Sequence, residues 1–233
     1  MERVIPLPGG VDMAQRSDLF PLTQDSVLLA GFVRPRPRER ALDLGAGQGV
    51  LGLMLMARCP DLCVDGVELS ACAAEQACLN YRRAEFDGRG RIVCADLRAL
   101  PGGMLGRYDL CLSNPPYFAP GRGAVARTAA KAGARCGCAP DELCASAGRA
   151  LRWGGRFFVC YRPDRLPALF AALASCRLEP KRLRFVHHQP GREACLALVE
   201  ARKGGGAQLD VMPPLFMQDE SGNCTPEALE MYR

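Results

Sequence analysis

The chain has 233 residues, with 30 Lys and Arg against 25 Asp and Glu, so its formal net charge is +5. This length suits one compact domain with a terminal addition, because single α/β domains reach about 250 residues. A hydrophobic content of 48% and a charged content of 24% exclude a disordered chain. The longest strongly apolar run, residues 50–57, is far shorter than the ~18 residues of a membrane span, and residues 1–10 lack a signal-peptide stretch. We therefore expect a cytoplasmic protein with no membrane segment.

Thirteen cysteines are scattered from Cys59 to Cys224, in segments that read as helices and strands. An odd number in such positions favours reduced thiols over a disulfide framework. Cys136, Cys138 and Cys144 form a cluster, but no Cys-x-x-Cys pair or nearby His completes a tetrahedral zinc set. The expectation is therefore that the protein binds no metal.

Residues 1–18 show no sustained period and are predicted as a lead-in that can hold short strands. Thr23, placed before the apolar run 27–30, predicts the start of a helix. Pro35 and Pro37 end that helix, because each lacks a backbone donor and biases the preceding residue to extended geometry. Residues 1–40 are thus expected to form a lead-in with a lid helix.

From residue 40 onward, strand-like apolar runs alternate with helical segments. The predicted strands are residues 41–44, 64–69, 91–95, 108–113, 156–161, 182–186 and 195–200. The predicted helices among them are residues 50–57, 71–84, 141–151 and 166–175. This alternation predicts a Rossmann-like α/β fold: a mostly parallel seven-stranded sheet with helices on both faces, spanning residues 41–203. The glycines at 204–206 set off an extension, residues 204–233, that is expected to pack on this domain.

Groups suited to a nucleotide follow the first three predicted strands. Ligands of open parallel sheets bind beyond the carboxyl ends of the strands. Asp43-Leu44-Gly45-Ala46-Gly47-Gln48-Gly49 joins the first strand to its helix, where glycines let the backbone turn tightly and approach a ligand. Glu68 ends the second strand and can accept both hydroxyls of a ribose, while Asp96 follows the third and can accept from an adenine amine. Residues 47–52 also match the G-x-G-x-x-G pattern, so an NAD-dependent dehydrogenase stays an alternative here.

Together these acids and glycines resemble the motifs of the class I S-adenosylmethionine-dependent methyltransferases, in which an acid precedes the glycines and no pyrophosphate is bound. The resemblance implies S-adenosylmethionine as the cofactor, with the amino-acid half near Asp43. The cofactor-binding residues that it implies are Asp25, Asp43, Gly45, Ala46, Gly47, Glu68, Leu69, Asp96, Leu97 and Asn114.

Ser113-Asn114-Pro115-Pro116-Tyr117 closes the fourth predicted strand, and its two prolines make a stiff, extended loop. The nitrogen of an adenine amine or a glutamine amide is a poor nucleophile, because its lone pair is delocalised. If the side-chain oxygen of Asn114 and the carbonyl of Pro115 accept its two hydrogens, the lone pair can be aimed at a sulfonium methyl by positioning alone. Tyr117 would stack on the flat group. The predicted catalytic residues are Asn114, Pro115, Pro116 and Tyr117.

The Asn-Pro-Pro-Tyr tetrapeptide resembles that of amino-methyltransferases acting on adenine N6, cytosine N4 or glutamine N5. It therefore indicates the reaction class and leaves the substrate open. A glutamine-N5 enzyme acting on a protein would carry a helical substrate domain ahead of the sheet, for which the residues before Ala41 are too few. A third alternative, an RNA-binding protein that has lost catalysis, does not account for an intact turn at 114–117 with intact cofactor acids.

Further stretches resemble the tRNA1(Val) adenine-N6 methyltransferase family, and the resemblance covers the chain from residue 15 onward. They are Thr23-Gln24-Asp25-Ser26-Val27-Leu28-Leu29-Ala30, Val67-Glu68-Leu69, Leu183-Arg184-Phe185-Val186-His187, residues 198–205, and Thr225-Pro226-Glu227 leading to Met231-Tyr232. The resemblance implies tRNA as the partner and methylation of an adenine next to the anticodon, at position 37, by an enzyme expected to be a monomer. The loop 121–137 departs from the family pattern. In the family an Arg in this loop tends to be followed by a polar and an acidic residue, whereas here Arg135 is followed by Cys136 and Gly137.

A basic stretch lies near the end of the predicted domain and contains one aromatic residue, Phe185. It is consistent with phosphate contacts, and equally with a solvated face of a strand and loop. Its members are Lys181, Arg182, Arg184, His187, His188 and Arg192.

Overall fold

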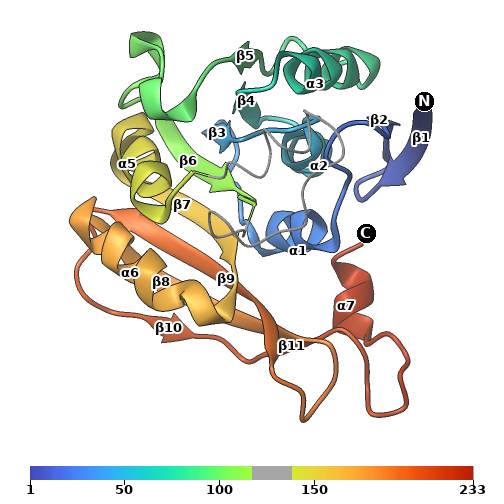
Figure 1. Ribbon diagram of the computed structural model, residues 1–233, viewed down its shortest axis with the longest axis vertical. Helices are drawn as coiled ribbons and strands as arrows, with labels where there is room; N and C mark the ends of the chain where they lie inside the picture. The colour runs from blue at the N-terminus through green and yellow to red at the C-terminus, as the bar shows by residue number, and fades with distance from the viewer. Residues whose placement is uncertain (117–137, 233) are drawn as a thin grey trace.

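The computed structural model describes residues 1–116 and 138–232, and its centre is a mixed β-sheet with helices on both faces (Figure 1). The strands of this sheet are β3 (Arg40–Leu44), β4 (Cys63–Glu68), β5 (Ile92–Cys94), β6 (Tyr108–Ser113), β7 (Leu151–Tyr161), β8 (Leu178–His187), β9 (Ala194–Lys203), β10 (Asp210–Val211) and β11 (Leu215–Phe216). Their order is β10-β8-β9-β7-β6-β3-β4-β5, with β11 also paired to β8. Neighbours from β7 to β5 are parallel, whereas β9 is antiparallel to both β7 and β8.

The predicted α/β fold with a mostly parallel sheet is confirmed, but the strand count is wrong. The seven predicted strands correspond to β3 through β9, whereas the described residues form a sheet of nine. The two additional strands, β10 and β11, are two residues long, flank Pro213 and Pro214, and pair in parallel with β8. So short a strand shows no alternating pattern of side chains, which is why the sequence does not reveal it.

Helices α1 (Gln24–Phe32), α2 (Val50–Arg58) and α3 (Ala71–Arg83) cover one face of the sheet, and α5 (Pro140–Ala150) and α6 (Leu166–Ser175) cover the other (Figure 1). Each face has its own hydrophobic core. The central strands are apolar and buried on both sides, as parallel strands between two helical layers must be. No helix in the described parts of the chain is both long and apolar enough to span a membrane.

The lead-in forms an antiparallel hairpin of β1 (Glu2–Leu7) and β2 (Val11–Arg16), which packs beside α2 and α3. Buried amides of α3 hold it. The side-chain oxygen of Asn80 accepts from the backbone N–H of Ala14 at 3.0 Å, and the side-chain nitrogens of Asn80 and Gln76 donate to the Ala14 carbonyl at 3.1 and 2.9 Å. These bonds fix where the chain leaves β2 and crosses the carboxyl edge of the sheet toward α1.

The segment after the sheet ends in α7 (Pro226–Glu230), which lies against α1 (Figure 1). A Cβ built on Gly31 would come within 2.3 Å of the sulfur of Met231, so glycine at this position lets Met231 pack directly on α1. The side-chain nitrogen of Gln24 donates to the hydroxyl of Tyr232 at 2.9 Å. Both ends of α1 are thus in contact with the tail.

Two arginines of the basic stretch, both on β8, have structural partners elsewhere in the fold. Arg182 pairs with Glu200 at 2.8 Å. Arg184 is 7% exposed, donates to the carbonyl of Pro213 at 3.1 Å and pairs with Glu227 of α7 at 2.6 Å. Arg184 therefore holds the tail, and its guanidinium does not face solvent as a phosphate contact would.

Candidate active site

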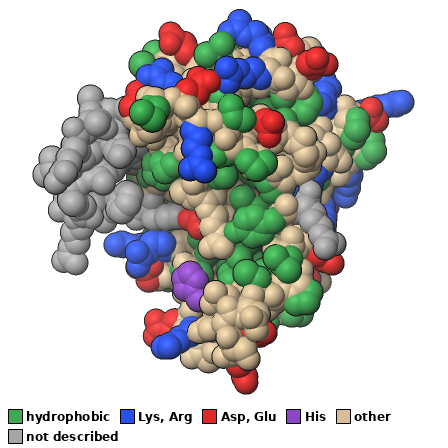
Figure 2. Space-filling view, turned by 90° about the vertical axis from the view of Figure 1, so that its right-hand side faces the viewer, with side chains coloured by type: hydrophobic (Ala, Val, Ile, Leu, Met, Phe, Trp, Pro, Cys, Tyr) green, Lys and Arg blue, Asp and Glu red, His purple; other side chains and the backbone are tan. Residues whose placement is uncertain are grey.

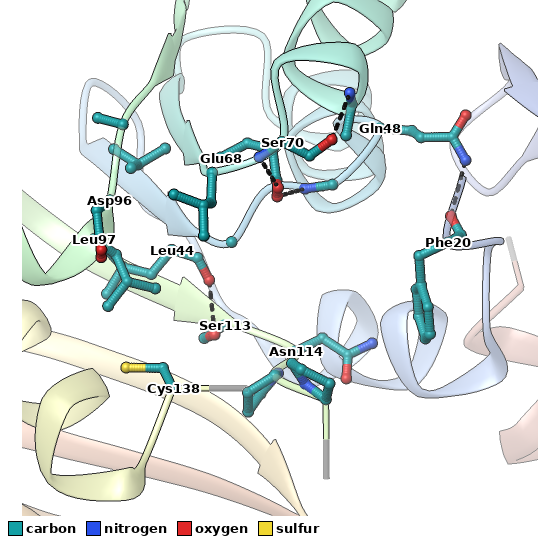
Figure 3. Close-up of a pocket in the computed structure, with 18 of the residues that line it drawn as sticks. Phe20, Leu44, Gln48, Glu68, Ser70, Asp96, Leu97, Ser113, Asn114 and Cys138 are labelled. Carbon is teal, nitrogen blue, oxygen red and sulfur yellow. Dashed lines mark hydrogen bonds between the residues drawn. The ribbon is translucent and has the colours of Figure 1, made fainter. Parts of the chain in front are cut away.

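A cavity of about 550 Å³ opens at the carboxyl ends of β3, β4, β5 and β6 (Figure 3). Most of the predicted site residues line it, although they come from loops far apart in the sequence. Three predicted residues, Asp25, Asp43 and Ala46, are not among the described residues that line it, and Tyr117 lies outside the described residues. The predicted residues that line the cavity are Gly45, Gly47, Glu68, Leu69, Asp96, Leu97, Asn114, Pro115 and Pro116.

The turn between β3 and α2 depends on glycine. Gly45, Gly47 and Gly49 have φ values of +81°, +55° and +86°, in the left-handed region that side chains disfavour. A Cβ on Gly45 or Gly47 would meet no atom within 4 Å, so the backbone there faces open space. The turn therefore presents bare peptide groups to the cavity just ahead of the first turn of α2.

Glu68 lies at the end of β4 with both carboxylate oxygens turned to backbone donors (Figure 3). One oxygen accepts from the N–H of Gly47 at 2.9 Å, and the other accepts from the N–H of Ser70 at 2.8 Å. A carboxylate offers about four acceptor sites, so roughly one remains on each oxygen for a ligand. The two backbone bonds thus hold the carboxylate in a fixed orientation at the wall of the cavity.

Asp96 follows β5 and forms a close pair with Arg98, another residue that lines the cavity. The Arg98 guanidinium donates to both carboxylate oxygens, at 3.0 and 2.7 Å, and the Arg98 backbone N–H donates to one of them at 2.9 Å. These bonds, above all the side-chain one, hold the pKa of Asp96 below its ordinary value. A ligand amine that binds Asp96 must therefore share this carboxylate with Arg98.

Asp43 is 1% exposed, and neither of its carboxylate oxygens has a hydrogen-bond partner among the described residues. Burial, reinforced by the nearby charge of Glu68, raises the pKa of Asp43 to about 8. The group is therefore largely protonated at neutral pH. The sequence places Asp43 correctly at the end of a strand, but its buried side chain is not in the wall of the cavity.

The turn after β6 begins with Asn114, whose side chain is held from two sides. Its amide nitrogen donates to the hydroxyl of Ser26 at 2.8 Å and lies 3.3 Å from the hydroxyl of Thr23. The thiol of Cys160 on β7 lies 3.1 Å from the amide oxygen. Thr23 is the N-cap residue of α1, as predicted, but its hydroxyl contacts Asn114 and makes no capping bond to the helix.

Ser113 fixes the start of the same turn. Its hydroxyl donates to the carbonyl of Leu44 at 2.8 Å, which joins the end of β6 to the end of β3 (Figure 3). Pro115 is buried, and its ring closes one side of the cavity together with that of Pro116. The stiff turn is therefore anchored at the centre of the sheet.

Sequence reasoning missed the residues that bring the lead-in over the cavity. Gln48, 2% exposed within the glycine turn, accepts from the N–H of Arg16 at 2.9 Å and donates to the carbonyl of Phe20 at 2.8 Å (Figure 3). Phe20 lines the cavity with 45% of its surface exposed. The sequence does contain a signal for this contact, which is a glutamine among glycines. A tight turn does not require a long polar side chain, so its presence indicates a hydrogen-bond partner elsewhere in the chain.

The face that carries the hairpin, α1 and α7 is not uniformly basic. Hydrophobic side chains gather over its middle, whereas Lys and Arg lie mostly toward its rim (Figure 2). The net charge of +5 is thus not concentrated at the centre of this face.

Three features together define a class I methyltransferase fold. The sheet has one antiparallel strand, β9, near its edge; a glycine turn follows β3; and the acids Glu68 and Asp96 lie at the ends of β4 and β5. Residues 22–172 match the family model described as the methyltransferase small domain. The chain belongs to this methyltransferase family, so the predicted enzyme class is confirmed and the dehydrogenase alternative is excluded.

Curated relatives support the narrower resemblance. A protein of Dickeya chrysanthemi named tRNA1(Val) (adenine(37)-N6)-methyltransferase is 36% identical over 194 residues, covering 81% of this chain and 75% of the relative. A protein of Yersinia pestis with the same name is 30% identical over 218 residues, covering 89% of this chain and 83% of the relative. Among solved structures, a predicted O-methyltransferase of Agrobacterium tumefaciens has a TM-score of 0.74 and 27% identity, covering 89% of this chain and 95% of that one. The two curated relatives confirm the resemblance to the tRNA1(Val) adenine-N6 methyltransferase family, and the solved structure supports the fold.

Proposed function

We propose that this protein transfers the methyl group of S-adenosylmethionine to the N6 amine of an adenine in tRNA, at position 37 of tRNA1(Val). The observation that carries the proposal is the anchored turn of Asn114, Pro115 and Pro116, which lines the same cavity as Glu68 and Asp96. The names of the curated relatives support tRNA as the substrate. We further propose that the enzyme acts as a monomer in the cytoplasm.

The residues present fit S-adenosylmethionine. The cavity is of the size that holds cofactors, which is typically ~300–1,000 Å³. Glu68 retains one acceptor site on each oxygen and can take two ribose hydroxyls, while the bare backbone at Gly45 and Gly47 allows close approach. Asp96 would accept from the adenine amine of the cofactor while still paired with Arg98. When bound, the cofactor supplies an electrophilic methyl group on a positively charged sulfur.

The chemistry assigned to the turn is positioning of the substrate amine. Adenine N6 has two hydrogens and a lone pair delocalised into the ring. The Asn114 side-chain oxygen and the Pro115 carbonyl would accept the two hydrogens, which favours a tetrahedral nitrogen, reduces the delocalisation of its lone pair and directs that lone pair toward the methyl group. The N–C bond forms as the C–S bond breaks, and the nitrogen then releases one proton to solvent. Tyr117 is proposed to stack on the base.

A transfer assay with defined tRNA tests this proposal. The purified protein is incubated with radiolabelled S-adenosylmethionine and tRNA1(Val) transcript, and the nucleosides are analysed. The expected product is N6-methyladenosine, and a transcript with guanine at position 37 should receive no label. Label in N6-methyladenosine of that control transcript would contradict the proposed position, and label found only in protein would favour the glutamine-N5 alternative.

The variant Asn114→Ala separates catalysis from cofactor binding. Loss of a group that orients the amine should lower kcat by ~10²-fold or more. The Kd for S-adenosylmethionine, measured by calorimetry, should stay within about twofold, because cofactor binding depends mainly on other residues. A Kd that rises in parallel with the loss of kcat would show that Asn114 binds the cofactor and does not orient the amine.

A further inference from the structure

Asn114 is held by two hydroxyls at the start of α1. Thr23 is the N-cap residue and Ser26 lies in the first turn, three residues later, so both side chains reach the same side of the helix. The Ser26 hydroxyl lies 2.8 Å from the amide nitrogen of Asn114, and the Thr23 hydroxyl lies 3.3 Å from it. Figure 3 shows the amide nitrogen of Asn114 turned toward this helix. The contact joins positions 88 and 91 residues apart in the sequence.

The hydroxyls also determine which end of the amide faces them. An amide nitrogen has two hydrogens, and the two hydroxyls supply two acceptors, so donors and acceptors match. The amide oxygen then lies on the other side, where it accepts from the thiol of Cys160 at 3.1 Å. Rotating the amide by half a turn would place both hydrogens against the thiol, whose sulfur is a weak acceptor. The two hydroxyls thus favour the orientation in which the oxygen points away from α1.

Neither hydroxyl belongs to a residue that lines the cavity. Ser26 is 8% exposed, and Thr23 and Ser26 are both absent from the described residues that line the cavity, whereas Asn114 is present. The helix that carries them is buried from Ser26 to Phe32 and is braced by the tail, where Gln24 donates to Tyr232 at 2.9 Å. The hydroxyls are therefore presented to Asn114 from a fixed support.

We propose that Ser26 and Thr23 are positioning residues for methyl transfer, which hold the Asn114 amide with its oxygen, the end that would accept from the substrate amine, turned away from α1. The proposal rests on the proposed function, because it assigns a purpose to the orientation of Asn114. Without the hydroxyls the amide can rotate between its two orientations, and a fraction of the enzyme then presents a donor where the amine needs an acceptor. Binding of cofactor and tRNA is unaffected, and only the rate of the chemical step falls.

Paired variants test this at each position. Ser26→Ala and Thr23→Val remove a hydroxyl, while Ser26→Thr and Thr23→Ser retain one. Ser26→Ala should lower kcat ~10- to 100-fold, as misplacement of an orienting group does, with KM for tRNA and Kd for S-adenosylmethionine within about twofold. Thr23→Val should have a smaller effect, since its hydroxyl is the more distant. Thr23→Ser should keep kcat near that of the wild type.

The control is Ser175→Ala, which removes a hydroxyl bonded to the carbonyl of Ala172 in α6, away from the cavity, and should leave kcat unchanged. If Asn114→Ala loses transfer while Ser26→Ala keeps full kcat, the positioning role is overturned and the proposed function stands. A rise in KM or Kd in Ser26→Ala in place of a fall in kcat also overturns it. A wild-type protein that transfers no methyl group overturns the proposed function together with this inference.

Discussion

Substitution of Glu68 by glutamine should weaken cofactor binding by an amount that follows from its hydrogen bonds. The carboxylate accepts from the backbone N–H groups of Gly47 and Ser70 at 2.9 and 2.8 Å, which leaves about one acceptor site on each oxygen. Glutamine replaces one oxygen with an NH₂ group, so one backbone donor and one ribose hydroxyl lose their acceptor. A hydrogen bond to a charged group contributes ~1.5–3 kcal/mol, so the Kd for S-adenosylmethionine should rise ~10- to 150-fold.

Calorimetric titration of S-adenosylmethionine into wild-type and Glu68→Gln protein measures this change directly. Glu75→Gln on α3 is the matched control, because Glu75 is exposed and is not among the described residues that line the cavity. It should bind the cofactor as the wild type does. A Kd for Glu68→Gln within about threefold of the wild type would mean that the carboxylate holds the glycine turn but makes no bond to the ribose, because threefold corresponds to less than ~0.7 kcal/mol.

Two further changes should alter the free energy of unfolding without cofactor, measured by urea denaturation. The raised pKa of Asp43, about 8 in the folded state, means that the folded protein keeps a proton that the unfolded chain loses, so stability falls by up to ~1.4 kcal/mol per unit between about pH 4 and pH 8. Asp43→Asn should abolish this slope, and parallel pH profiles for variant and wild type would refute the assignment. One guanidinium nitrogen of Arg156 donates to both carboxylate oxygens of Glu39, at 2.8 and 2.9 Å, so Arg156→Ala should cost ~3–5 kcal/mol, since it strands a buried carboxylate. Arg162→Ala, which breaks an exposed pair with Asp164, should change stability little, and an equal loss in both variants would contradict the argument.

The order of apolar runs and helical segments was enough to predict β3 through β9, because β3, β4, β5 and β6 are short, mostly apolar runs that alternate with helical segments. Boundaries were less predictable. β7 begins at Leu151, five residues before its predicted start, because the strand continues through Gly154 and Gly155, a residue type that is depleted in strands. Gly154 has a φ of +79°, and the pairing with β6 shifts register at this point.

The wall of the cavity was predictable wherever topology alone decides position. Glu68, Asp96 and Asn114 each follow a parallel strand, and the carboxyl ends of such strands meet at one edge. The burial of individual side chains and the contacts between residues distant in the sequence were not predictable. Asp43 lies near the end of β3 in the same way, yet its side chain is buried and does not line the cavity. The contact of Ser26 with Asn114 depends on the path of the lead-in across the sheet, which no local pattern records.

Contacts between α7 and α1 join two segments that the ribosome makes at widely separated times. Helix α1 emerges before any strand of the main sheet, whereas Met231 and Tyr232, which brace it, emerge after all of them. Pairings between residues so distant in sequence form late, because a long loop must close first. During synthesis the strand ends that line the cavity can therefore form well before the support behind Asn114 is complete, so that a nascent chain would acquire the cavity before the turn at Asn114 is fully held.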